Sequence, residues 1–370
     1  MSTTISNKLF LFAVIGMLFA STAVCVFADD GDAASSYTVT DGQGTEFSFS
    51  EAPSHIVTAG TGISATAIQI GSLSKIVVCD KYTKTNTSSV FADLQTKINN
   101  NEVRANGSCY SSGQADLKAD IVYVTDNGGF DKAKDAIILT GSFTTLQSLV
   151  DELRTLGYQK VMVWKDITDY ADLVGFIRSV SLAINGEVTS YVAQMENLSE
   201  YISSHLSGVE KKGALYTTYS SSDYKVGNNG SLANSMIVAA GGTSITVDGT
   251  KSGSTYGDKA TLTKFIVDNP TVVIFLDNSI AKDSSKVAEV TEMCGSTEHT
   301  MVALDPLWNN YSIASMDGVW AMACAMYPDI FHGDIPTVNG GSNDNTVLYI
   351  GAAVAAVAII GVAGFIFMRR

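Results

Sequence analysis

The clearest pattern of apolar and polar positions lies in the middle of the chain, at residues 169–206. Apolar residues recur there every three or four positions, first over 170–184 and then over 188–206, which is the spacing of amphipathic helices. Asn185-Gly186 interrupts the run where a helix end would fall. We therefore predict a shorter helix followed by one of about 20 residues, about 30 Å long, which connects the two halves of the chain.

Short β-like runs alternate with helical runs on both sides of this element. Near-continuous β-branched runs are typical of parallel strands that are buried on both faces. The predicted fold class is α/β, with two doubly wound α/β lobes at residues 29–168 and 207–332, joined by a long interdomain helical element at residues 169–206. The expected strands are residues 55–59, 75–79, 120–125, 161–164, 214–219, 271–276 and 301–304, after an opening hairpin around residues 41–44.

The first 28 residues have the pattern of a signal peptide. Lys8 precedes an apolar stretch, and small side chains near Ala28 fit cleavage after that residue. Lipidation of Cys25 is the alternative, which the bulky Val24 before it disfavours. The sequence therefore predicts that the mature chain begins outside the cytoplasm.

The other end of the chain has the pattern of a membrane anchor. Residues 347–368 are an almost unbroken apolar run, about 33 Å long as a helix, and Arg369-Arg370 follow. Because positive residues stay on the cytoplasmic side, everything before the run is expected outside the cell. We predict a linker at 333–345, a transmembrane helix at 346–368 and a protein anchored at the cell surface through it. A buried core helix is disfavoured because the run follows a Gly/Asn/Ser/Asp-rich spacer.

Charge and cysteine content narrow the picture further. The net charge is −14 and no cluster of Lys and Arg occurs, which excludes nucleic acid as a partner. Cys79 and Cys109 precede the central element, and Cys294 and Cys324 follow it, each pair 30 positions apart. An extracellular address favours one disulfide within each lobe, with four free thiols as the alternative.

The turn after the first strand resembles a dinucleotide-binding fingerprint. Gly60-Thr61-Gly62 opens a helical segment, and an acidic residue, Asp80, follows 20 positions after Gly60. A tight strand-to-helix turn that faces a cleft needs the same glycines, and a secreted protein lacks access to cytosolic nicotinamide cofactors. We therefore interpret Thr61 and Gly62 as cleft residues, and a secreted Rossmann-type enzyme is the alternative.

Polar and aromatic residues gather where strands are expected to end. Ligands of open α/β sheets bind outside the carboxyl ends of the strands, and aromatic faces with polar tips suit a large, partly apolar ligand. Capping of helices and turns explains the Asp-Asn pairs equally well. Alternation places Tyr216 and Tyr219 on opposite faces of their strand. The candidate ligand-binding residues are Thr61, Gly62, Tyr82, Asp126, Asn127, Trp164, Tyr219, Tyr224, Tyr256, Asp277, Trp308 and Tyr311.

No catalytic motif occurs in the chain. H-E-x-x-H, G-x-S-x-G and P-loop patterns are missing, and the four histidines and the cysteines lack zinc-type spacing. We therefore expect a protein that is not an enzyme, with no catalytic residue, no resident cofactor and no metal site.

The order of segments resembles the solute-binding proteins of ABC importers with the Fe/B12 periplasmic-binding domain, which handle ferric siderophores, haem and cobalamin. The segments that carry the likeness are TVTDGQGTEFSFSEAP (38–53), HIVTAG (55–60), LKADIVYV (117–124), the helical region from Asp169 with Gly186, SLANSMIVAAGG (231–242), DNPTVVIF (268–275) and SMDGVWAMACAMYPDIF (315–331).

The resemblance implies two α/β lobes bridged by a rigid helix, a shallow cleft, small hinge motion and delivery of the ligand to an ABC permease and its ATPase. The C-terminal anchor looks like an archaeal variant of such a receptor. Ser112 and Thr263 stand where the family commonly has an exposed Glu in each lobe. The leading hypothesis is a surface-tethered protein that captures a ferric chelate, haem or a cobalamin-like corrinoid. The alternative is a receptor or structural protein with this fold and no transport coupling.

Overall fold

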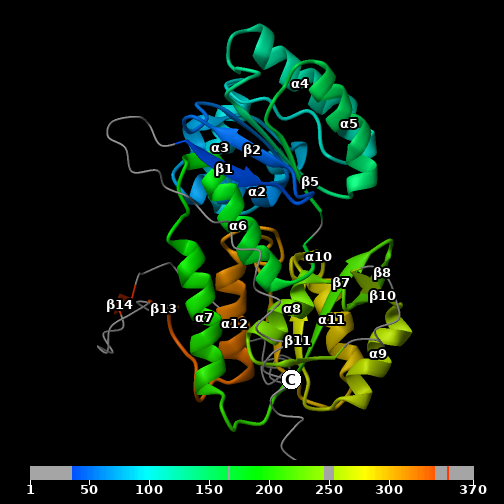
Figure 1. The fold of residues 1–370 in the computed structure, drawn as a ribbon. Helices are drawn as coiled ribbons and strands as arrows, with labels where there is room; N and C mark the ends of the chain where they lie inside the picture. Colours follow the sequence, from blue (N-terminus) through cyan, green and yellow to red (C-terminus); the bar gives the residue numbers. More distant parts are fainter. Residues whose placement is uncertain (1–35, 166, 246–253, 338–347, 350–370) are drawn as a thin grey trace, which may run out of the picture.

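A computed structural model describes residues 36–165, 167–245, 254–337 and 348–349 of the 370-residue chain (Figure 1). Within these residues the chain forms two α/β lobes, one above the other, each built on its own sheet. The predicted two-lobed α/β class is therefore confirmed. The predicted signal peptide lies outside the described residues.

The N-terminal lobe contains a four-stranded parallel sheet in the order β4-β3-β5-β6. Continuous apolar sequences form these strands because both faces of the sheet are covered. One face packs against a cluster that includes α2, α3, α6 and the β1–β2 hairpin, and the other face packs against α4 and α5. The elements are β1 (Tyr37–Thr40), β2 (Glu46–Phe49), β3 (Ile56–Ala59), α2 (Thr61–Gln69), β4 (Ile76–Cys79), α3 (Ala92–Asn99), α4 (Gln114–Asp126), β5 (Ala136–Thr140), α5 (Phe143–Thr155) and β6 (Val161–Trp164), with short 3-10 helices η1 (Leu73–Lys75), η2 (Lys81–Thr85), η3 (Ser89–Phe91) and η4 (Ser111–Gly113).

The C-terminal lobe contains a mixed sheet in the order β10-β8-β7-β11-β12, with β9 also paired to β7. Strands β7, β11, β12 and β9 are parallel, β8 pairs antiparallel with β7, and β10 pairs antiparallel with β8. Helices α7, α8 and α12 cover one face, and α9 and α11 cover the other. The elements are β7 (Gly213–Ser220), β8 (Asp223–Gly227), α8 (Leu232–Ala239), β9 (Thr243–Ser244), β10 (Thr255–Tyr256), α9 (Lys259–Asp268), β11 (Val273–Leu276), α10 (Asn278–Ala281), α11 (Ser284–Met293), β12 (Met301–Ala303) and α12 (Ser315–Met326).

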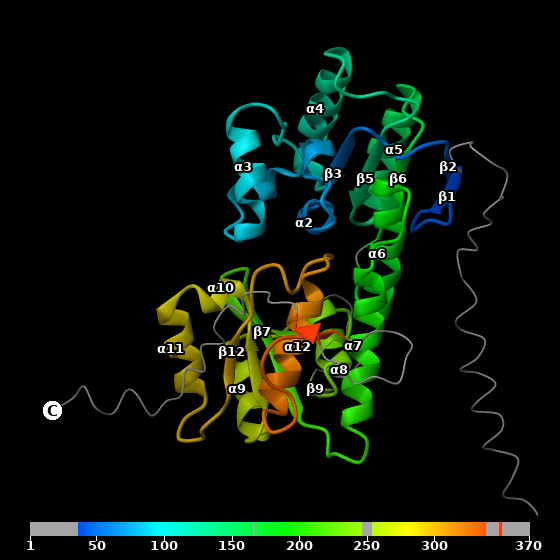
Figure 2. The same ribbon diagram turned by 90° about the vertical axis from the view of Figure 1, so that its left-hand side faces the viewer.

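Two helices, α6 (Tyr170–Asn185) and α7 (Tyr191–His205), connect the lobes (Figure 2). Helix α6 begins beside the C-terminal lobe, where the Tyr170 N–H donates to Ser235 Oγ at 2.9 Å. It ends in the N-terminal lobe, where Asn185 Oδ1 accepts from Ser72 Oγ at 2.7 Å. Gly186 ends the helix with a φ of 74°, and α7 returns to the C-terminal lobe.

The predicted break at Asn185-Gly186 is confirmed, but the second helix, predicted to have about 20 residues, is shorter. The two helices have 16 and 15 residues, and α6 alone runs from the C-terminal lobe to the N-terminal lobe. The chain reverses between them, and the Thr189 N–H donates to Ser181 Oγ of α6 at 3.2 Å. The apolar repeat continues through this reversal because both helices bury a face in the same core.

The predicted strand at residues 120–125 is also wrong, because these residues form the second half of α4. The apolar run at residues 120–125 is typical of a buried strand, but in α4 the side chains of Leu117, Asp120 and Ile121 are buried at helical spacing. Asp120 reaches inward from the helix and accepts from Arg104 Nε at 2.9 Å. Its buried carboxylate is therefore part of the N-terminal lobe's support.

The predicted disulfides are wrong as well, because none is present among the described residues. Cys79 packs in the cluster on one face of the N-terminal sheet, while Cys109 packs on the other. Likewise, Cys294 and Cys324 lie against opposite faces of the C-terminal sheet. A sheet therefore separates the members of each predicted pair.

The predicted linker at 333–345 is described as far as residue 337, and the predicted transmembrane helix at 346–368 is described only at residues 348–349. Near the end of the chain, β13 (Pro336–Thr337) pairs with β14 (Leu348–Tyr349), and β14 is the described part of the predicted span. Within the described residues, no helix combines the length and apolarity that crossing a bilayer requires.

Candidate functional site

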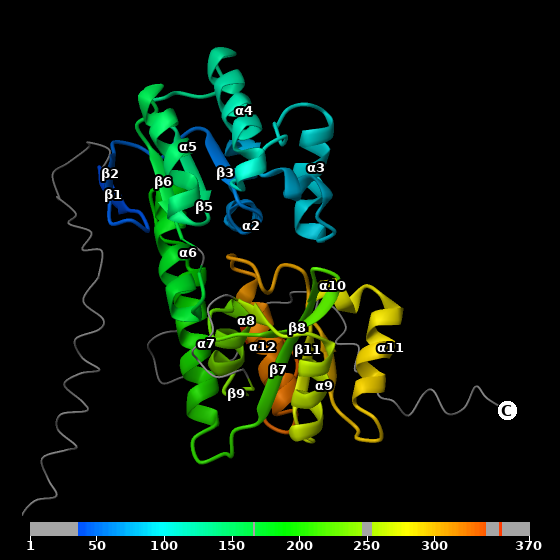
Figure 3. The same cartoon turned by 90° about the vertical axis from the view of Figure 1, so that its right-hand side faces the viewer.

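The two lobes face each other through the carboxyl ends of their parallel strands. In the N-terminal lobe this edge carries Gly60, Asp80 and Gly141, and in the C-terminal lobe it carries Asp277 and the segment after β12. Figure 2 and Figure 3 show the lobes stacked in this way, with α6 and α7 along one side. We call the facing edges the interlobe surface, and it is the place where an α/β sheet offers a ligand site.

Gly62 and Tyr311 bring the lobes into backbone contact. A Cβ atom added to Gly62 would lie 2.6 Å from the Tyr311 carbonyl oxygen and 2.8 Å from its backbone nitrogen. No other residue fits at this position, because real Cβ atoms do not approach backbone atoms so closely. Gly62 therefore allows the two lobes to touch, and both residues lie on the interlobe surface.

This contact explains the fingerprint-like turn without a dinucleotide. The space beside Gly62 is filled by Tyr311 rather than left for a pyrophosphate. Asp80, the acidic residue 20 positions after Gly60, accepts from the Tyr82 N–H at 2.8 Å and caps η2. Thr61, the first residue of α2, stays half-buried at the same edge.

Asp277 lies at the carboxyl end of β11, as predicted, but its oxygens are engaged by the protein. Tyr216 Oη donates to Asp277 Oδ2 at 3.0 Å, and Thr218 Oγ1 donates to Oδ1 at 3.2 Å. The Ser279 N–H also donates to Oδ1 at 2.8 Å, which makes Asp277 the N-cap of α10. Burial and the Asp277 charge raise the pKa of Tyr216 well above its usual value. This network fixes the local structure of the interlobe surface.

The most exposed aromatic pair of the interlobe surface is Tyr82 and Tyr110. Tyr82 follows β4, and Tyr110 follows Cys109, whose Sγ donates to the Ala59 carbonyl at 3.1 Å at the end of β3. The two rings meet edge to face, 5.7 Å between centroids, and their exposed fractions are 46% and 65%. Lys81 Nζ lies 5.3 Å from the centre of the Tyr82 ring. The pair offers an aromatic platform with one positive charge at the rim of the N-terminal lobe.

Several predicted residues lie elsewhere. Trp164 ends β6 but is only 6% exposed and packs edge to face against Phe176. Tyr219 and Tyr224 pack against each other on the face covered by α9 and α11. Tyr256 is in the edge strand β10. Of the aromatic candidates, Tyr82, Trp308 and Tyr311 lie in segments of the interlobe surface.

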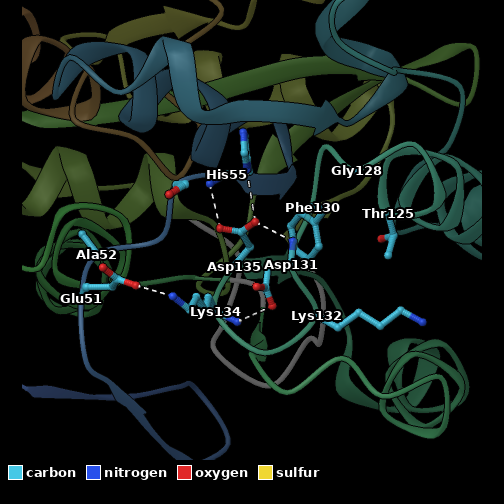
Figure 4. A pocket seen from close by; sticks show the side chains of 11 residues that line it. Glu51, Ala52, His55, Thr125, Gly128, Phe130, Asp131, Lys132, Lys134 and Asp135 are labelled. Carbon is cyan, nitrogen blue, oxygen red and sulfur yellow. Dashed lines mark hydrogen bonds and ion pairs between the residues drawn. The ribbon is translucent and has the colours of Figure 1, made fainter.

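Asp126 and Asn127 lie at the far end of the N-terminal lobe, because residues 120–125 are helical. Next to them is a shallow hollow of about 560 Å³ near the amino ends of β3 and β5 (Figure 4). Its polar groups bond to one another: Asp135 Oδ2 is 3.2 Å from His55 Nδ1, and Lys134 Nζ is 2.8 Å from Glu51 Oε1. The hollow is remote from the interlobe surface, and its charges are internally matched.

The structure adds an acidic cluster that the sequence analysis missed. Asp317 lies in the first turn of α12, and burial, followed by the nearby Asp305, raises its pKa to about 6. Tyr170, the first residue of α6, is 4% exposed, and burial followed by the Asp317 charge raises its pKa. In the sequence, Asp317 looks like an ordinary first-turn acid and Tyr170 like a core residue, so only the packing of α6 on the C-terminal lobe reveals the cluster.

Among the described residues, no group of three or more His, Cys, Asp or Glu side chains is arranged to hold a metal ion. No protein-family model matches the sequence, and no curated protein matches it significantly.

Solved structures show the same fold. A nickel–histidine complex of CeuE from Helicobacter pylori has a TM-score of 0.57 at 14% identity and covers 80% of this chain and 89% of its own. A periplasmic haem-binding protein from Pseudomonas aeruginosa has a TM-score of 0.52 at 17% identity, covering 75% of this chain and 94% of its own. The periplasmic haem-binding protein RhuT from Roseiflexus has a TM-score of 0.54 at 15% identity, covering 75% and 98%. Two of these neighbours are haem-binding proteins of the periplasm, and other neighbours with the same fold are periplasmic solute-binding proteins, so the chain has the fold of such proteins.

Proposed function

We propose that this protein is the extracellular solute-binding component of an ABC importer. The observation that carries the proposal is the architecture: two α/β lobes face each other through the carboxyl ends of their sheets, and α6 with α7 bridges them. Solved solute-binding proteins share this arrangement over 75–80% of the chain. The partners would be a membrane permease and its ATPase.

The proposed solute is a metal chelate or corrinoid, such as a ferric siderophore, haem or cobalamin. The sequence resemblance and the neighbours that bind haem or nickel–histidine support this class. The exposed Tyr82–Tyr110 pair with Lys81 supplies aromatic faces and a positive charge for such a ligand. The C-terminal apolar run, as a membrane helix, would hold the binding lobes at the cell surface.

The test is a ligand screen on the full chain by visible absorption and thermal unfolding, with haemin, cobalamins and ferric siderophores. A ligand at 100 times its dissociation constant stabilises the folded state by about 2.7 kcal/mol. Tyr82→Ala and Tyr110→Ala should weaken binding, whereas Tyr123→Ala removes an exposed tyrosine from α4, far from the interlobe surface, and should not. A well-folded protein that binds no member of the panel would contradict the proposed solute class.

One observation favours a second function, a surface receptor or structural protein without transport coupling. Ser112 in η4 is exposed and uncharged, and Thr263 in α9 is half-buried, where the resembling family commonly has docking glutamates. Stimulation of the importer's ATPase by the solute-loaded protein would support import. Solute binding with no such stimulation would favour the receptor.

A further inference from the structure

Five asparagines of the chain stand in the Asn-x-Ser pattern of N-glycosylation acceptors: Asn86, Asn106, Asn197, Asn229 and Asn310. All five lie in the described part of the chain. The pattern alone does not decide which of them is modified. A sugar chain is bulky and hydrated, so it needs an asparagine whose amide reaches the surface of the folded protein. The surroundings of each asparagine therefore show which of them can carry a sugar.

Asn106 and Asn310 use their side-chain nitrogen inside the fold. Asn106 Nδ2 donates to Asp120 Oδ1 at 2.8 Å, and Asp120 is only 2% exposed. Asn310 is half-buried, and its Nδ2 donates to the Pro306 carbonyl. At both positions a sugar on this nitrogen would compete with an internal hydrogen bond.

Asn86 and Asn197 are partly covered by the protein. Both are half-buried. Asn86 Oδ1 accepts from the Ser88 N–H at 2.9 Å, which fixes its side chain against the next residues. Asn197 lies in the middle of α7 rather than in a surface loop. Neither side chain projects openly from the lobe that carries it.

Asn229 differs from the other four. It is exposed, and its side chain forms no hydrogen bond with a described residue. It lies in the turn between β8 and α8 (Figure 1), where the Ser231 N–H donates to the Asn228 carbonyl at 2.8 Å. Asn229 and Gly230 are therefore the two central residues of a β-turn. At this position Nδ2 can carry a large group without the loss of an internal contact.

We propose that Asn229 carries an N-linked glycan. The proposal rests on the extracellular address that belongs to the proposed function, because sugar transfer of this kind acts on exported chains. In the transfer, Asn229 Nδ2 forms a bond to C1 of the first sugar of an oligosaccharide that is linked to a lipid phosphate. The bond between that carbon and the phosphate oxygen breaks, and the proton that Nδ2 loses leaves with the phosphate. No oxidation or reduction takes place.

The position of Ser231 sets the order of events. This residue completes the acceptor pattern, but in the folded lobe it is the N-cap of α8 and is only 3% exposed. A transferase that reads its hydroxyl must therefore act before the C-terminal lobe folds. In the folded protein the sugar projects from the β8–α8 turn, and its bulk excludes this turn from close contact with a permease.

The test is mass spectrometry of the full chain isolated from the cells that naturally produce it. Trypsin cuts after Lys225 and Lys251, so Asn229 falls in the peptide 226–251, and Asn106 falls in the peptide 105–118. We expect the first peptide to carry the added mass of a sugar chain, which fragmentation assigns to Asn229. The second peptide should have the mass of its sequence.

Three variants decide between Asn229 and its neighbours. Asn229→Gln keeps an amide but removes the acceptor, and Ser231→Ala breaks the pattern while keeping Asn229, so each should lose the added mass. Ser231→Thr keeps the pattern and is the matched control, so it should retain the added mass. The peptide map of the wild type decides the question even where a variant does not fold.

The proposal is overturned by an unmodified Asn229 in the wild type, or by added mass on peptide 226–251 that persists in Asn229→Gln. Protease treatment of intact cells separates these results from the proposed function. An unmodified Asn229 on a protein that the protease reaches overturns the glycan alone. An unmodified Asn229 on a protein that stays protected inside the cell overturns the extracellular address as well.

Discussion

Replacing Asp317 by Asn should stabilise the protein at neutral pH. Asp317 is half-buried in the first turn of α12, and burial, followed by the charge of the nearby Asp305, raises the pKa of its carboxyl group. Asn keeps the size and shape of the side chain while removing the charge. The change therefore isolates the cost of holding that charge in the folded state.

The magnitude follows from the pKa of Asp317, which rises from 3.8 to about 6 on folding. At 1.36 kcal/mol per pKa unit, the shift corresponds to about 3 kcal/mol. Between these two pKa values the folded protein binds more protons than the unfolded chain, so its stability falls as the pH rises. The full penalty is present above about pH 6 and is relieved as the pH falls toward 4.

The assay is urea unfolding of the wild type and Asp317→Asn at constant ionic strength and several pH values between 4 and 7.5. Asp317→Asn should be more stable by up to about 3 kcal/mol at pH 7.5 and equal to the wild type near pH 4. The wild-type minus variant difference removes the contributions of other groups such as Asp80, whose pKa is also raised by burial. A difference that does not change with pH would refute the reasoning.

Three further predictions test the contacts described above. Gly62→Ala should cost about 1–3 kcal/mol, because its methyl group would collide with the Tyr311 backbone; Gly175→Ala, in open space on α6, should instead be neutral or stabilise by up to about 1 kcal/mol in the same urea titration. Asp120→Ala should cost about 3–5 kcal/mol, since it leaves Arg104 and the Asn106 N–H without their buried acceptor; Asp126→Ala, at the exposed end of the same helix, should stay within about 0.5 kcal/mol, and an equal loss in both would contradict the argument. Cys79, Cys294 and Cys324 should react with iodoacetamide after unfolding without a reductant, as peptide mapping would show; protection of these residues that only a reductant removes would indicate disulfides.

The fold class could be predicted from local patterns because both lobes alternate short buried strands with amphipathic helices. The helical repeat before and after Asn185-Gly186 marks α6 and α7, and the alternation along β7 correctly places Tyr216 and Tyr219 on opposite faces. The prediction failed at residues 120–125, where a run of apolar residues is compatible with either a strand or a helix. In the structure the run is helical, and its buried Asp120 pairs with the half-buried Arg104. Local sequence does not contain such a tertiary contact.

The candidate site was predicted less completely, for two physical reasons. Cysteine spacing does not show on which face of a sheet each thiol lies. In each predicted disulfide the two cysteines lie on opposite faces of the sheet. Similarly, the start of α6 meets the C-terminal lobe through the Tyr170 N–H and Ser235 Oγ, a contact that depends on the packing of the whole chain. Gly62 and Tyr311 were named as candidates, but their direct contact could be seen only in the structure.

One hydrophobic cluster runs through both lobes, from Val39 in the opening hairpin through α6 and α7 to Phe331 beyond α12. Such continuity couples the melting of one half to that of the other, so calorimetry should record a single transition whose van't Hoff and measured enthalpies agree. It also limits dissection of the chain, because a fragment that stops before α6 would leave the inner face of the N-terminal sheet bare to water. The two lobes are thus separate in topology but share one thermodynamic unit.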